Sequence, residues 1–186
     1  QLIQRLDLER AVRTPQRPVE RVHPGVTQIR LADAKRGNAV ALSGTALSER
    51  HLGLMKRYSE NLMLVLDADP AGLKATARSA ALALQSGLRV KAAQLPKGKD
   101  PADLISEDSK EFAKRVAAAK PIVEFFLGEL AQQENDPHRL LRVAEGIVLP
   151  LIQAIPSPME REHFVQAAAR SLGLSGEAIR ESLKRL

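Results

Sequence analysis

Two aspartates separated by one alanine, Asp67 and Asp69, are the residues of this sequence best suited to bind a metal ion. They directly follow the apolar run Asn61–Leu66 and precede Pro70-Ala71-Gly72. Hard carboxylate oxygens close together suit Mg²⁺, or Mn²⁺ in its place, because Mg²⁺ takes one or two carboxylates and keeps water and substrate phosphates as its other ligands. A turn from a strand into a helix also directs backbone N–H groups at an anion. The alternative is that either aspartate caps the following helix.

A second charged cluster follows the next apolar run and reads Lys97-Gly98-Lys99-Asp100-Pro101-Ala102-Asp103. The ends of neighbouring parallel strands meet at one edge of a sheet. We therefore expect Asp100 to join Asp67 and Asp69 as a metal ligand, with Lys97 and Lys99 facing phosphate. The alternative is a charged turn followed by an N-cap aspartate, and we assign that capping role to Asp103.

Basic residues on the helices predicted to flank this cleft could contact a template or a nucleotide. Phosphate contacts supply most of the non-specific affinity for nucleic acids. The alternative is that these residues form the solvated face of a helix. The candidates are Lys56, Arg57, Lys74 and Arg78.

Composition favours a polyanionic partner such as nucleic acid, because the 186 residues carry a formal net charge of +6. A well-solvated basic surface is the alternative. Aromatic residues make up only 3% of the chain, so base stacking is poorly supplied and a nucleic acid would be held mainly by its phosphates.

Cysteine is absent, which excludes disulfides, thiolate metal sites and thiol nucleophiles. The isolated histidines His51, His138 and His163 receive no catalytic role. No apolar run approaches the ~20 residues that cross a bilayer. The start of the sequence also lacks the apolar core of a secretory signal, so we expect a cytoplasmic protein with no membrane partner.

Alternating strand and helix signals surround the aspartates. Strands are predicted at 38–42, 61–66 and 88–95, with a helix opening at Ser48 and another at 71–85. This order indicates βαβ units and a largely parallel sheet whose strand ends would carry the carboxylates.

The remainder of the chain is predicted to be helical or irregular. Residues 1–37 suggest a short helix, an irregular link and one strand at 26–31. We therefore divide the chain into an irregular segment 1–37, a metal-binding domain 38–106 and a helical subdomain 107–186. Helices are predicted at 101–119, 121–133, 137–155, 157–172 and 175–185.

Several stretches together resemble a known family. NAVALSGTALSERHLGLMKRY, LVLDADPAGLKAT and LPKGKDPADLI are similar, in this order, to the Toprim segment of DnaG-type bacterial primases. KPIVEFFLGEL and VLPLIQAIPSPMEREHFVQAAARSLGLS resemble the helical subdomain that follows it. The resemblance runs from Asn38 to the C-terminus.

This resemblance implies a fold, an activity and a set of ligands. It implies a Toprim-like, mainly parallel sheet flanked by helices and followed by an α-helical subdomain. Asp67 and Asp69 correspond to the family's DxD metal ligands and Asp100 to a later acidic residue, whereas Asp103 lies one position beyond the family's second acid.

The implied activity is that of a DNA-directed RNA polymerase. It is the Mg²⁺-dependent synthesis of short RNA primers from ribonucleoside triphosphates on single-stranded DNA during replication. The implied location is the bacterial nucleoid. A replicative helicase is the implied partner, through regions outside this chain.

One family motif is missing. The catalytic glutamate, found in a stretch such as EGYMD upstream of the SGTAL-like turn, has no recognisable counterpart. His23 lies near its expected position and Glu20, in VERVHP, is the closest glutamate. We favour loss of the glutamate over replacement by Glu20.

Two hypotheses follow. The first is a primase catalytic core, and the alternative is a non-catalytic Toprim relic that binds nucleic acid or a replication partner. Other Toprim enzymes, such as topoisomerases and nucleases, are disfavoured by the primase-like C-terminal stretches.

Overall fold

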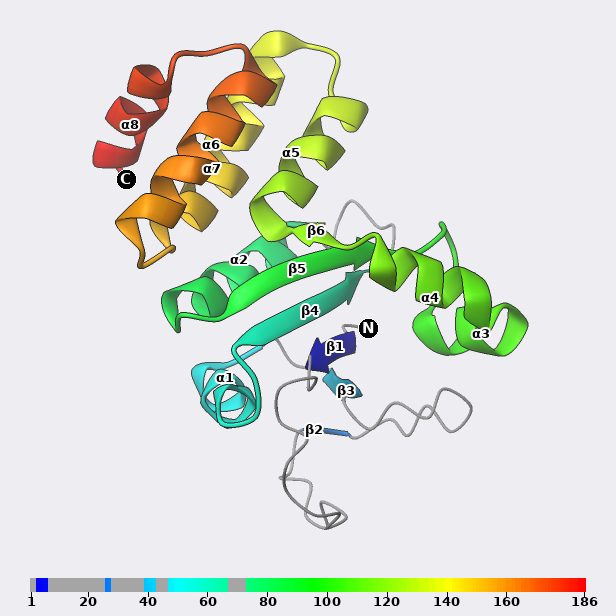
Figure 1. Ribbon diagram of the computed structural model, residues 1–186. Helices are drawn as coiled ribbons and strands as arrows, with labels where there is room; N and C mark the ends of the chain where they lie inside the picture. Colours follow the sequence, from blue (N-terminus) through cyan, green and yellow to red (C-terminus); the bar gives the residue numbers. More distant parts are fainter. Residues whose placement is uncertain (1–2, 7–25, 28–38, 43–46, 67–72) are drawn as a thin grey trace.

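The computed structural model describes residues 3–6, 26–27, 39–42, 47–66 and 73–186. Its strands form one six-stranded sheet in the order β2-β3-β1-β4-β5-β6 (Figure 1). The strands are β1 (Ile3–Leu6), β2 (Val26–Thr27), β3 (Ala39–Leu42), β4 (Asn61–Leu66), β5 (Arg89–Gln94) and β6 (Lys120–Pro121).

Helices follow or separate these strands. The predicted α/β class, a sheet flanked by helices and followed by a helical part, is confirmed. The helices are α1 (Glu49–Lys56), α2 (Leu73–Gln85), α3 (Pro101–Glu107), α4 (Ser109–Ala117), α5 (Ile122–Gln133), α6 (Pro137–Gln153), α7 (Pro158–Leu172) and α8 (Gly176–Lys184).

The centre of the sheet is the parallel pair β4 and β5, which α2 connects. Residues pair in register from Asn61 with Arg89 to Leu66 with Gln94. The crossover ends at Gly87, whose φ of 77° lies in the left-handed region and lets the chain leave α2 and turn into β5. The predicted strand 61–66, the stop at Ser86-Gly87 and the following strand are all confirmed.

The sheet is mixed rather than mainly parallel. Strand β1 lies between β3 and β4 and pairs antiparallel with both, so it separates two strands that the βαβ pattern predicts as neighbours. Among the described strands, β4 and β5 form the one parallel pair. The helix predicted between β3 and β4 indicates correctly that these two strands run in the same direction. It does not indicate whether another strand lies between them.

The first described strand also corrects the prediction for the N-terminal segment. Residues Ile3–Leu6 form a strand inside the sheet, where a short helix was predicted. Pairing with two neighbouring strands gives these residues backbone partners on both sides, and such tertiary pairing overrides weak local helix propensity. The predicted strand at 26–31 is present as Val26–Thr27, and its other residues lie outside the described part.

Helix boundaries in the C-terminal half agree with the prediction, with one exception. The predicted helix 101–119 is two helices, α3 and α4, which meet at Asp108. The Asp108 carboxylate accepts hydrogen bonds from the backbone N–H groups of Lys110 and Glu111, both at 3.0 Å, and so begins a new helix. The two-residue strand β6 follows α4 and was not predicted, because Lys-Pro has no strand pattern of its own.

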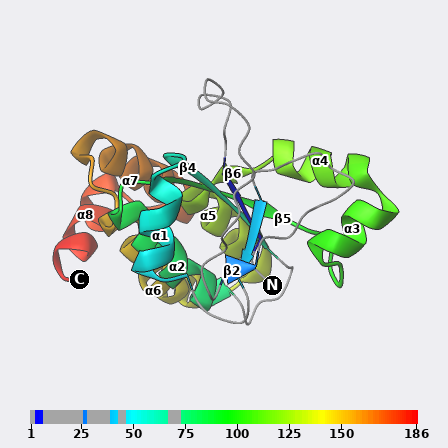
Figure 2. The same cartoon turned by 90° about the horizontal axis from the view of Figure 1, so that it is seen from below.

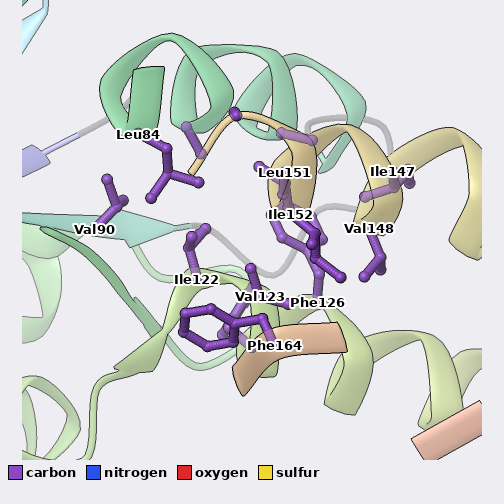
Figure 3. Packing of buried hydrophobic residues seen from close by; sticks show 14 of the residues in the cluster. Leu84, Val90, Ile122, Val123, Phe126, Ile147, Val148, Leu151, Ile152 and Phe164 are labelled. Atoms are coloured by element: carbon purple, nitrogen blue, oxygen red, sulfur yellow. The ribbon is translucent and has the colours of Figure 1, made fainter. Parts of the chain in front are cut away.

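One hydrophobic core joins the sheet to helices α5 to α8. In β4, Leu62, Leu64 and Leu66 belong to this core, and they share it with α2, α5, α6 and α7. Figure 3 shows Phe126 of α5 among Val123, Ile152 and Phe164, which come from three different helices. The helical part therefore packs directly onto one face of the sheet.

A smaller core covers the opposite face of β4. Val65 and the partly buried Met63 alternate with the residues of the main core, as the two faces of a strand require. They pack with α3 and α4, which lie at the end toward which β4 and β5 point (Figure 1). The members of this cluster are Val65, Leu95, Leu104, Ile105, Phe112 and Val116. None of the described helices has the length and apolarity that crossing a membrane requires.

Replacing Phe126 by alanine tests the shared core. The side chain is 0% exposed and its ring packs edge-on against Phe125 at 5.6 Å between centroids. We expect Phe126→Ala to lower the free energy of unfolding by about 3–5 kcal/mol, measured by urea denaturation. Met159→Ala, at a side chain that is 86% exposed, is the control and should shift the free energy of unfolding by less than about 0.5 kcal/mol. A small loss in Phe126→Ala would contradict a single core.

Candidate metal site at the ends of two parallel strands

The ends of β4 and β5 lie side by side at one edge of the sheet. Leu66 pairs with Gln94, and the backbone N–H of Leu95 donates to the Leu66 carbonyl at 2.9 Å. Leu66 is 5% exposed and Leu95 is 1% exposed, so both strand ends are anchored in the protein interior. Side chains that follow these two residues therefore start from a rigid, shared edge.

Asp67 and Asp69 follow Leu66 in the sequence and lie outside the described residues. Within the described ranges, no three acidic or histidine side chains come together as a metal site. The part of the predicted site that can be placed is consequently the segment after β5, which carries Lys97, Lys99 and Asp100.

Asp100 is the N-cap of α3. Its Oδ1 accepts a hydrogen bond from the backbone N–H of Asp103 at 2.7 Å, and Pro101 occupies the first turn. The capping role assigned to Asp103 was therefore wrong, since Asp103 lies exposed in the first turn of α3. Capping uses one oxygen of Asp100, and a carboxylate can bind a metal through the other.

The two lysines of this segment differ in their contacts. Gly98 has a φ of 76°, and the Lys99 N–H donates to the Pro96 carbonyl at 3.2 Å, which closes a tight turn. Lys97 is exposed on this turn. Lys99 reaches along α3 to Glu107, with 2.6 Å between Nζ and Oε1.

Glu107 is a partner that the sequence analysis missed. Its hydrogen bond is the main cause that raises the pKa of Lys99. Desolvation opposes this effect, and the negative charges of Glu107 and Asp103 add to it. A signal for it existed, because Asp103 and Glu107 are four residues apart and so share one face of α3. Lys99 thus contacts an acidic helix face, where phosphate was predicted.

Lys56 lies near the edge of the sheet where β5 begins, and Arg57 follows it at the end of α1, so their contact with phosphate stays a prediction. The Lys56 ammonium donates to the Ser86 carbonyl at 2.6 Å, beyond the end of α2 and before the start of β5. A six-residue strand spans about 17 Å, which separates this edge from the strand ends where the carboxylates follow. Figures 1 and 2 both show α1 and the pair α3–α4 at opposite ends of β4 and β5. Lys56 stabilises the C-terminal end of α2.

Lys74 and Arg78 lie in the first half of α2, which follows β4 in the sequence, and their contact with phosphate stays a prediction. α2 begins at Leu73, six residues after Asp67, and both basic side chains are exposed on it. Their spacing of four residues places them on one helix face. They form no ion pair with a described residue.

Family models match both halves of the chain. A Toprim-like model matches residues 26–105, and the model of the DnaB-helicase binding domain of primase matches residues 147–177. The second match lies within the chain, which differs from the expectation that helicase contacts lie outside it.

Individual relatives agree with these models. The DNA primase of Pseudomonas aeruginosa is 37% identical over 158 residues, which are 81% of this chain and 24% of the relative. The crystal structure of a DNA primase domain from Pseudomonas aeruginosa superimposes with a TM-score of 0.65 at 31% identity, over 83% of this chain and 50% of that one. The chain belongs to the DnaG-type bacterial primases.

A further solved structure of the family, the DnaG primase catalytic domain bound to ssDNA, has a TM-score of 0.58 and 28% identity. It covers 75% of this chain, which in turn covers 46% of it. This primase-family chain spans about a quarter of the length of the curated primases that it matches.

The cap geometry predicts how two substitutions of Asp100 differ. Asparagine caps helices as well as aspartate does, whereas alanine does not cap. We expect Asp100→Ala to lower the free energy of unfolding by about 1 kcal/mol in thermal or urea denaturation and Asp100→Asn to leave it nearly unchanged. Equal losses in the two variants would show that the charge, and not the cap, is what α3 requires.

Proposed function

We propose that this chain supplies the metal-binding half of a primase active site, for Mg²⁺-dependent synthesis of short RNA primers on single-stranded DNA. The observation that carries the proposal is the adjacent parallel ends of β4 and β5, because the sequence continues from them into Asp67, Asp69 and Asp100. In parallel α/β sheets this edge is where ligands bind.

The donor set fits Mg²⁺ or Mn²⁺. Carboxylate oxygens are the ligands that these ions prefer, and the capped Asp100 keeps one oxygen for such a role. The ion would neutralise charge on the triphosphate of the incoming ribonucleotide. The chain has no cysteine, so it offers no thiolate ligand that would favour a softer metal ion over Mg²⁺ or Mn²⁺.

The basic side chains near this edge would hold and orient phosphates. Lys97 is exposed in the turn after β5, and Lys74 and Arg78 are exposed on α2, which follows β4. Lys99 would bind a phosphate only after its hydrogen bond with Glu107 is broken. A relative of known structure is the catalytic domain bound to ssDNA, which supports single-stranded DNA as a partner of this chain.

The helical half is proposed to contact the replicative helicase. The match of residues 147–177 to the DnaB-helicase binding domain of primase supports this partner. We keep the division into a metal-binding domain 38–106 and a helical subdomain 107–186 as part of the proposal, with one core shared between them.

A non-catalytic role is the second candidate, and a specific observation favours it. The family's glutamate motif has no recognisable counterpart, and Glu20 lies outside the described residues. Nucleotidyl transfer needs a positioned 3′-hydroxyl and a group that helps deprotonate it. A chain without that glutamate would still bind metal and DNA.

Metal binding tests the assignment of the aspartates. We expect Asp67→Asn and Asp69→Asn each to abolish Mn²⁺ binding measured by calorimetry, because they are the two principal carboxylates of the site. Asp100→Asn should only weaken binding, because Asp100 is the additional ligand. Asp103→Asn is the matched control from the same segment and should bind normally. Unchanged binding in all three variants would mean that these aspartates only cap helices.

Primer synthesis separates the two candidate functions. The missing glutamate leads us to expect very weak or no synthesis by this chain on single-stranded DNA with ribonucleotides and Mg²⁺ or Mn²⁺, while weak, salt-sensitive DNA binding persists. Robust synthesis that disappears in Glu20→Gln would contradict this and give Glu20 the missing role. Robust synthesis that survives Glu20→Gln would show that no glutamate at that place is needed.

A further inference from the structure

The last helix, α8, packs against α6 and α7 but buries little of its own surface. Ile179 is its one buried residue at 3% exposed, and Leu183 is partly buried beside it. The nine residues of α8 are too few for a stable isolated helix in water. Its helical state therefore depends on packing against α6 and α7, beside which it lies in Figure 1.

An exposed ion pair provides the other attachment. Arg180 of α8 donates two hydrogen bonds to Glu162 of α7, at 2.8 Å from Nη2 to Oε1 and 3.1 Å from Nε to Oε2. Gln166 donates to the same carboxylate at 2.8 Å. These bonds lower the pKa of Glu162 to about 2, so the pair stays ionised near neutral pH. Both side chains are almost half exposed, at 45% and 46%, and salt weakens such pairs.

Net charge differs between the two halves of the chain. Residues 1–106 contain 17 basic and 10 acidic side chains, whereas residues 107–186 contain 11 basic and 12 acidic ones. A polyanion is attracted to the first half and gains nothing from the second. Net charge therefore favours a nucleic acid at the first half and not at the helical half.

The residues that match the helicase-binding model include α7 and the end of α6, and α8 packs against these two helices. The match runs from Ile147 in α6 through all of α7 and ends at Glu177, in the first turn of α8. Buried residues of α7, namely Phe164, Val165, Ala168 and Ala169, belong to the same core as Ile179. A helix docked on α6 and α7 thus occupies part of the region that the proposal gives to the helicase.

We infer that α8 is a displaceable latch, which covers an apolar face of α6 and α7 that a helix of the replicative helicase occupies when α8 leaves. The inference rests on the proposed helicase contact. A partner that binds only the open form has an apparent affinity reduced by the fraction of molecules that are open. Holding α8 closed should therefore weaken helicase binding, and releasing it should strengthen binding.

The chain has no cysteine, so two introduced cysteines can be cross-linked without side reactions, and the cross-link would hold α8 in place. The double variant Glu162→Cys, Arg180→Cys, joined by a short bis-maleimide, replaces the ion pair with a covalent link. Arg180→Glu opens the latch, because it sets a like charge against Glu162 without touching the apolar face. Arg185→Glu makes the same charge change in the same segment, at a residue that forms no ion pair with a described residue, and is the control.

Binding of each form to the purified DnaB-type helicase is measured by calorimetry, with hydrogen exchange of α8 amides reporting the open fraction. We expect roughly tenfold weaker binding by the linked form, several-fold tighter binding with faster exchange by Arg180→Glu, and wild-type binding by Arg185→Glu. Equal affinities of the linked and open forms, or weaker binding by Arg180→Glu, would overturn the latch while leaving the helicase contact in place. Absence of binding in every form would overturn the helicase contact and the latch with it.

Discussion

The parallel pairing of β4 with β5 aligns the two strand ends from which the sequence continues into the candidate metal ligands. It brings Leu66 and Leu95 within one backbone hydrogen bond of each other, and the candidate metal ligands follow these two residues in the sequence. Both faces of β4 are buried, because Leu62, Leu64 and Leu66 share a core with α2 and α5 to α7, and Val65 packs with α3 and α4. A strand covered on both faces cannot shift its register without exposing apolar side chains, so the two strand ends stay aligned.

Sequence patterns predicted the parts of the fold that are governed by local signals. The apolar run Asn61–Leu66, the stop at Gly87 and the capping serine Ser48 each act within a few residues, and the structure has all three as expected. The insertion of Ile3–Leu6 between β3 and β4 depends on pairing between residues that are far apart in the sequence. No local pattern carries that information, which is why the sheet is mixed instead of mainly parallel.

The candidate site was predictable in its residue types and only partly in its contacts. A short segment between a strand and a helix indicates that its carboxylate will lie near the end of the strand. Whether Asp100 or Asp103 is the N-cap depends on where the helix begins, and the two positions differ by a single turn. The positions of basic side chains were harder to predict, because a long flexible side chain takes the nearest acceptor. Lys99 thus contacts Glu107, and Lys56 contacts the end of α2.

Locating a bound paramagnetic ion would show whether the ends of β4 and β5 form a metal site. Mn²⁺ added below stoichiometric amounts to ¹⁵N-labelled protein broadens amide signals steeply with proximity to the ion. A metal ion at this place should strongly broaden the amides of Leu66 and Leu95 and broaden those of Asn61 and Arg89, at the other end of the same strands, much less. Broadening centred on the acidic side chains of the helical half, or equal at both ends of the strands, would contradict it.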